Sequence, residues 1–216
     1  MSDARAILAA DEQEREASAV GLERIVFFSD AVFAIGITLL VLDIHIPERG
    51  AVPPADLPAQ VLDLWPRVAA YILSFLVVGL FWMAHHRIFH YIRRFDTRLI
   101  WLNLLFLMTI AFLPVPTALL AAYGDQPISA MVYAGVVTLA AVLEPAFWSY
   151  ASNGHRLIDA TLDPVTIRVT SYRALLTIVV FGASIVLAYF SPFLAELAWT
   201  LTLFVRRAVN RLVLRG

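Results

Sequence analysis

The chain has 216 residues, of which 61% are hydrophobic and 15% charged, and its mean hydropathy is +0.79. About half of an average soluble protein is apolar, so this composition excludes a water-soluble globular fold and indicates an integral membrane protein. The absence of cysteine excludes disulfides, thiol catalysis and thiolate metal sites, while the net charge of −1 carries no information about partners.

Apolar runs of about 20 residues, the length that a spanning helix needs, recur along the chain. Residues 68–86, 99–124, 126–143 and 174–195 carry no Asp, Glu, Arg or Lys, and residues 25–46 are apolar apart from a few polar positions. A shorter sixth run ends at Arg206 and Arg207, whose side chains can reach the headgroups. The sequence therefore predicts one all-α transmembrane domain over residues 1–216, with six spans at approximately 25–46, 68–89, 99–123, 127–151, 168–190 and 192–212.

Arginine placement predicts the orientation of these spans. All 16 basic residues are arginines, and 14 of them lie in the amino tail, the links between spans two and three and between four and five, and the carboxyl tail. Only Arg49 and Arg67 remain for the opposite side. By the positive-inside rule both termini are cytoplasmic. Residues 1–23 lack the apolar stretch of a signal peptide, so the first span is expected to direct insertion.

The first span has two different faces. At 100° per residue, Asp30 lies about 140° and Ser29 about 120° in the other direction from Ile35. An aspartate inside a membrane helix costs roughly 2.5 kcal/mol or more, so Asp30 needs a partner on a neighbouring helix. The opposite stripe consists of Ile35, Thr38, Leu39 and Leu42. Periodicity alone is also typical of a lipid-facing or helix-packing stripe, so this pattern does not by itself indicate a pore.

Three segments resemble the lysosomal and bacterial potassium channels of the transmembrane protein 175 family. The first span contains RxxxFSD, from Arg24 to Asp30, followed by AVFAIGITLLVLD. The second ends in FWMAHHRIF, with Trp82 and His85, and the third reads NLLFLMTIAFLPVPTALL, with Asn103 and Pro114. The three segments occur in the family's order, which makes the resemblance specific.

The resemblance implies a potassium-selective channel of the bacterial plasma membrane rather than an enzyme. Four identical chains would surround a central pore lined by the first helix, with the bilayer and K⁺ as the other partners, no nucleic acid and no cofactor. By position, the constriction falls on Ile35, Leu39 and Leu42, and Thr38 is a hydroxyl-bearing pore residue. Such an apolar ring can block ions by dewetting, and without a TVGYG string we expect modest selectivity. The residues that match the family's structural polar network are Arg24, Phe28, Ser29, Asp30, Trp82, His85 and Asn103. Because a carboxylate in a low-dielectric site has to be paired, we expect Asp30 to contact Arg24, Ser29, His85 or Asn103 of its own chain.

Two alternatives remain from other classes. His86 and His90 have the i, i+4 spacing of zinc ligands, which would suit a membrane metalloenzyme, although no HExxH pattern accompanies them. Asp30 and Glu144 are carboxylates within or near spans, as in proton-coupled transporters. No paired inverted halves are evident, which disfavours a transporter.

Overall fold

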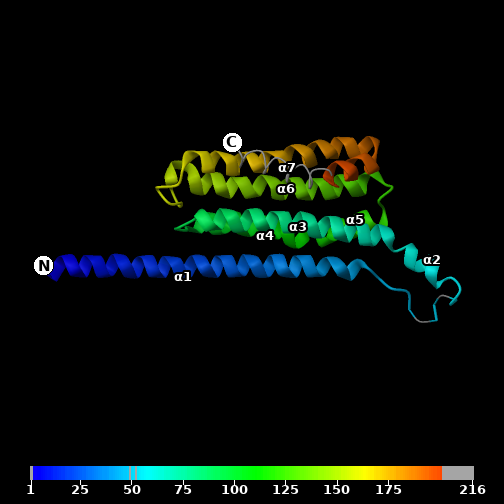
Figure 1. Cartoon of the computed structure of the whole chain (residues 1–216), viewed down its shortest axis with the longest axis horizontal. Helices are drawn as coiled ribbons and strands as arrows, with labels where there is room; N and C mark the ends of the chain where they lie inside the picture. Colours follow the sequence, from blue (N-terminus) through cyan, green and yellow to red (C-terminus); the bar gives the residue numbers. More distant parts are fainter. Residues whose placement is uncertain (1, 49, 52, 201–216) are drawn as a thin grey trace.

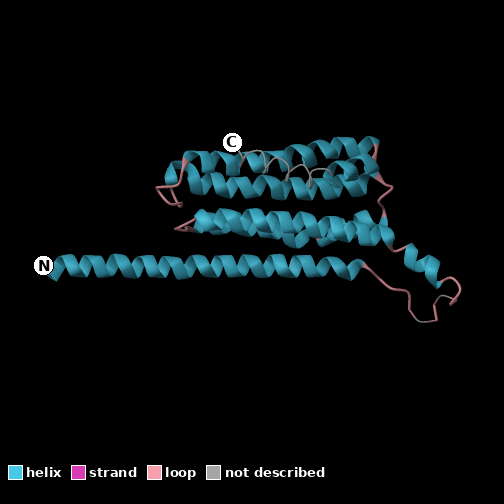
Figure 2. Ribbon diagram, viewed as in Figure 1, coloured by secondary structure: helices cyan, strands magenta, loops and turns pink. Residues whose placement is uncertain are grey.

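The computed structural model describes residues 2–200 apart from residues 49 and 52, and the side chains of residues 2–17, 173, 174 and 176 are not described. The described part is helical throughout its regular elements (Figure 2). The α-helices are α1 (Ser2–Leu39), α2 (Leu57–Leu62), α3 (Trp65–Tyr91), α4 (Thr97–Phe112), α5 (Pro114–Ala122), α6 (Pro127–Ser152) and α7 (Pro164–Phe190). Two 3₁₀ segments, η1 (Leu40–Asp43) and η2 (Asn153–His155), follow α1 and α6, and residues 192–200 are also helical.

Proline and aspartate mark where these helices begin. Helices α2, α3, α5, α6 and α7 each carry proline in their first two positions, where its fixed φ suits the helix and the missing N–H is not needed. The Asp96 and Asp163 side chains accept hydrogen bonds from the first backbone amides of α4 and α7. Local sequence thus fixes the helix starts.

Within the described residues, five helical stretches are long and apolar enough to cross a membrane, which makes the chain an all-helical multi-pass membrane protein. They are Ser18–Asp43, Leu57–Tyr91, Thr97–Ala122, Pro127–His155 and Pro164–Phe190. The expected third span, 99–123, consists of two helices, α4 and α5, that meet at Leu113, because Pro114 and Pro116 have no amide hydrogen to donate. Of the expected sixth span, 192–212, residues 201–212 lie outside the described residues.

Helix α1 differs from the expected range 25–46 at both ends. It begins at Ser2, because residues 2–17 are rich in Ala, Glu and Arg, which favour helix. It changes to the 3₁₀ segment η1 after Leu39, and residues 44–48 are not helical. Pro47 disfavours helix at the residue before it, and the Asp43 carbonyl oxygen accepts a 3.0 Å hydrogen bond from Arg67 Nη1.

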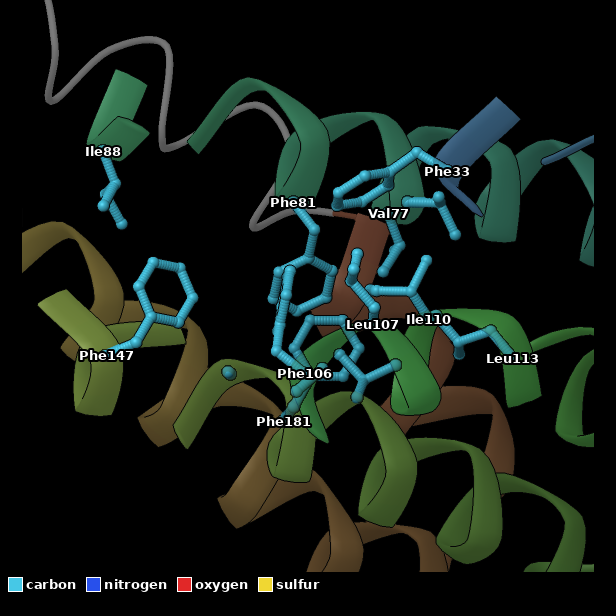
Figure 3. Close-up of a cluster of buried hydrophobic side chains, with 14 of the residues drawn as sticks. Phe33, Val77, Phe81, Ile88, Phe106, Leu107, Ile110, Leu113, Phe147 and Phe181 are labelled. Atoms are coloured by element: carbon cyan, nitrogen blue, oxygen red, sulfur yellow. The ribbon is translucent and has the colours of Figure 1, made fainter. Parts of the chain in front are cut away.

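The helices form layers that lie roughly side by side (Figure 1). Helix α1 lies along α3 and α4, α6 packs on α4 on the side away from α1, and α7 packs on α6. Buried aromatic and aliphatic side chains from α1, α3, α4, α6 and α7 fill the space between the layers (Figure 3). Phe106 and Phe147 are fully buried, and Phe106 lies 5.7 Å from Phe147 and 5.9 Å from Phe81 between ring centroids. The middle of the bundle is therefore occupied by side chains.

Candidate functional site

A buried hydrogen-bond chain joins the first three membrane helices. Ser29 Oγ on α1 accepts a 3.0 Å bond from Asn103 Nδ2 on α4, and Asn103 Oδ1 accepts one of 2.9 Å from His85 Nε2 on α3. Ser29 Oγ also donates to the Ile25 carbonyl at 2.8 Å. Since Asn103 Oδ1 can only accept, His85 carries its proton on Nε2. All three side chains are at most 2% exposed, so each depends on its partners for hydrogen bonding.

Aromatic rings enclose the histidine of this chain. The His85 ring stacks on Phe89 at 4.4 Å and on Phe106 at 5.8 Å between centroids, and Phe33 and Phe147 approach it edge-on. These rings exclude water from the polar contacts, and hydrogen bonds in such a low-dielectric place fix the relative positions of helices strongly. The arrangement serves to hold α1 against α3 and α4.

Asp30 has a different partner from those expected. Its Oδ1 accepts a 2.8 Å hydrogen bond from Trp82 Nε1 on α3, whereas Arg24, Ser29, His85 and Asn103 were its expected partners. Trp82 lies three residues before His85, so both side chains face α1 from adjacent turns. The indole N–H is a donor only, which suits an acceptor such as a carboxylate.

The structure leaves two residues of the proposed network outside it. Arg24 is exposed and Phe28 is 53% exposed. Consecutive helix positions are 100° apart, so the rotation that buries Ser29 turns Phe28 away from the bundle. Arg24 and Phe28 are therefore on the outer face of α1, although they lie close in sequence to Ser29 and Asp30.

The apolar stripe of the first span lies on the exposed side of α1. Ile35 is 58%, Leu39 41% and Leu42 66% exposed, and Leu42 belongs to the 3₁₀ segment η1. Thr38 is exposed beside them, with its hydroxyl donating to the Ile35 carbonyl at 2.8 Å. The two faces inferred from helical phase are therefore separate: polar residues pack inward and the apolar stripe has no cover within the described part of the chain.

Sequence reasoning missed the contact that holds the end of η1. Arg67, in the first turn of α3, donates to the Asp43 carbonyl, and its Nη1 lies 3.8 Å from Asp43 Oδ2. This contact fixes the chain one residue beyond Leu42. The isolated position of Arg67 on the arginine-poor side was the only signal in the sequence.

The i, i+4 spacing of His86 and His90 is that of zinc ligands, but no further ligands gather around them in the described residues. No group of three or more His, Asp, Glu or Cys side chains comes together there. His86 and His90 are both exposed, and the His86 ring lies 5.7 Å from that of Trp82.

Comparisons with known proteins identify the family. The family model described as "Endosomal/lysosomal potassium channel TMEM175" matches residues 24–114, which contain the Ser29, Asn103 and His85 chain. A protein of Streptomyces collinus named as a potassium channel is 40% identical over 172 residues, covering 78% of this chain and 82% of the relative. The chain belongs to the TMEM175 family.

The chain is also similar to a TMEM175 protein of known structure and to TMEM175 proteins of animals. The crystal structure of a lysosomal potassium-selective channel TMEM175 homolog from Chamaesiphon minutus superposes with a TM-score of 0.78 at 30% identity, covering 88% of this chain and 97% of that one. The human endosomal/lysosomal proton channel TMEM175 is 30% identical over 85% of this chain, which spans 36% of the human protein. TMEM175 proteins are ion channels, so the chain is not an enzyme.

Proposed function

We propose that this TMEM175 protein is a potassium channel in which four copies of the chain surround a pore lined by α1. The bacterial relative of 40% identity is named a potassium channel, and the similar crystal structure is titled potassium-selective. The chain would sit in a bacterial plasma membrane with six spans and both termini in the cytoplasm, as its arginine placement favours.

The packing of a single chain favours a pore between subunits. Aromatic side chains fill the bundle at Phe106 and Phe147, which leaves no room there for a hydrated ion. Only 22% of the most apolar part of the span Ser18–Asp43 is buried, against 27% for Pro164–Phe190 and 39–44% for the other three described spans. Helix α1 therefore has the most surface to contribute to an assembly, and this exposure is the observation that carries the proposal.

The constriction would be formed by Ile35, Leu39 and Leu42. Four copies of each apolar side chain around an axis can exclude water, and an ion then has to lose hydration to pass. Thr38 would add four hydroxyls beside these rings. Its hydroxyl hydrogen is directed to the Ile35 carbonyl, which leaves the oxygen lone pairs available to a cation. The polar network would hold α1 at the correct rotation.

Proton permeation is a second candidate, because the animal relatives are named proton channels. An apolar constriction that wets briefly could pass protons along a transient water file. The same ring would then serve both ions, and their relative permeability has to be measured.

Liposome flux distinguishes these functions. Vesicles loaded with K⁺ and diluted into K⁺-free buffer report proton uptake with a pH-sensitive dye. A potassium channel gives proton uptake only when a protonophore supplies the counter-current. A proton channel gives uptake with valinomycin and no protonophore. Uptake with neither ionophore indicates either a channel that passes both ions or a proton-coupled antiporter. Proton uptake that is no greater with the protonophore than in liposomes without protein would contradict the potassium-channel proposal.

A further inference from the structure

The two connections at the arginine-rich end of the bundle are joined by backbone hydrogen bonds. The Arg93 and Arg94 amides, which follow α3, both donate to the Leu157 carbonyl, at 2.8 and 3.1 Å, after α6. Ile92 pairs with Ile158, and both are 1% exposed. Gly154, at φ +60°, makes the turn that returns the chain from α6. The backbone that carries the arginines is therefore held in place.

The two connections and the start of α4 carry four arginines from separate parts of the sequence, and the guanidiniums of two of them lie on one tyrosine ring. Arg93 and Arg94 lie on the first connection, Arg98 on the first turn of α4, and Arg156 on the second connection. The guanidinium carbons of Arg98 and Arg156 each lie 4.9 Å from the centroid of the Tyr150 ring, so at most twice that distance separates them. Cation–π contacts thus hold two like charges near each other.

The nearby carboxylates leave these guanidiniums with free donors. Asp96 accepts from the Leu99 amide at 2.8 Å and from the Tyr150 hydroxyl at 2.5 Å, and Asp159 Oδ1 accepts twice from Thr161. Both ion pairs, Arg156 with Asp96 and Arg93 with Asp159, are 3.8 Å long, beyond hydrogen-bond distance. The arginine side chains stay about 60% exposed in both pairs. Four arginines against Asp96, Asp159 and Glu23, which lies beside Arg93, leave this surface with a net positive charge.

The location suits a lipid. Arg98 and Tyr150 lie at the ends of membrane spans, where phospholipid phosphates lie. Arg93 also lines a groove of about 290 Å³, whose other walls are mostly apolar, with Leu22, Val26, Phe27 and Ile92, and with Glu23 as the one acidic group. An acyl chain can occupy such a groove while the phosphate stays among the arginines.

We propose that Arg93, Arg94, Arg98 and Arg156 form a binding site for the phosphate headgroup of an anionic phospholipid, with Tyr150 orienting two of the guanidiniums. Arginine forks bind phosphate oxygens in pairs, and basic clusters beside membrane spans attract anionic lipids. The bound lipid would bridge the α3–α4 and α6–α7 connections, a role independent of the potassium pathway.

The test measures lipid binding to the full chain in detergent. Melting temperature is followed while phosphatidylglycerol or phosphatidylcholine is added, and apparent affinities are obtained from the shift. We expect saturable stabilisation by phosphatidylglycerol alone. Arg98→Gln and Arg156→Gln should each weaken it about fivefold or more, from about 1 kcal/mol per arginine at a membrane surface. Tyr150→Phe, which keeps the ring, should weaken it less.

Arg168→Gln is the matched control, because Arg168 is an exposed arginine on α7 outside the cluster. It should leave the affinity for phosphatidylglycerol unchanged. Equal weakening by Arg168→Gln would overturn the site in favour of general surface charge. Stabilisation by inorganic phosphate or glycerol phosphate at the same concentrations would show a free-anion site and overturn the lipid assignment. Unchanged affinity in both Arg98→Gln and Arg156→Gln would overturn the site itself.

Discussion

Replacing Asn103 by leucine should destabilise the protein through the loss of two interhelical hydrogen bonds. Asn103 is 2% exposed and contacts Ser29 Oγ at 3.0 Å and His85 Nε2 at 2.9 Å. Interhelical hydrogen bonds in membranes contribute about 0.6 kcal/mol on average and about 1.7 at most. Two such bonds give about 1 to 3.5 kcal/mol. Leucine has the branching and the heavy-atom count of asparagine, but its two methyl groups need more room, which adds to the loss. We expect the free energy of unfolding to fall by at least that amount.

The assay is unfolding of the purified protein in mixed micelles, followed by tryptophan fluorescence. Thr109→Val is the control on the same helix, because Thr109 is buried but donates only to the Phe106 carbonyl of α4. A double-mutant cycle of Asn103→Leu with His85→Phe isolates their bond, and we expect a coupling of about half a kcal/mol or more. Equal stability of Asn103→Leu and Thr109→Val, with no coupling, would refute the role of the network in holding α1.

Three further predictions concern other contacts of α1 and α4. Asp30→Ala removes the acceptor of Trp82 Nε1, so the unfolding free energy should fall by about 1 kcal/mol, and an unchanged value would contradict this contact. Gly21→Ala places a Cβ 2.5 Å from Cζ of Phe95, so the ring has to shift. We expect the helix propensity that alanine adds, about 1 kcal/mol, to appear in a Phe95→Ala background and not in the wild type; an equal effect in both would exclude the clash. Desolvation raises the pKa of Asp96, but hydrogen bonds and a nearby arginine outweigh it and hold that pKa below the usual 3.8. Its stabilisation is therefore present above pH 3.8 and lost as pH falls through the lower folded pKa, so the melting temperature of Asp96→Asn should depend less on pH between 5 and 3 than that of the wild type.

The division of α1 into two faces was predictable because it depends only on helical period. Ser29 is buried and the Ile35 stripe exposed, as 100° per residue requires. The contact of His85 with Asn103 was accessible only through resemblance, because nothing in the spacing of residues 18 positions apart determines which side chains meet. The same limit explains why Trp82 was not foreseen as the partner of Asp30.

Helix ends were harder to predict than faces. Hydropathy does not register that Arg67, 24 residues away, binds the Asp43 carbonyl at the end of η1. Nor does it distinguish one span from two helices meeting at Leu113, since Pro114 is apolar. The α3–α4 and α6–α7 connections are held together by a backbone hydrogen bond from Arg93 to Leu157, and a pattern of side chains cannot predict such a bond.

Potassium and sodium flux through Ile35→Asn tests the central claim most directly. Asparagine has as many side-chain heavy atoms as isoleucine but is smaller and hydrogen-bonds water, so a constriction at Ile35 should lose its dewetting barrier. Val179→Asn makes a similar polar change on α7, at a side chain that is 63% exposed, and is the matched control. We predict that Ile35→Asn raises potassium flux into or out of liposomes and weakens discrimination against sodium, while Val179→Asn changes neither. Unchanged flux and selectivity in Ile35→Asn, in protein that assembles normally, would contradict a pore constricted by this face of α1.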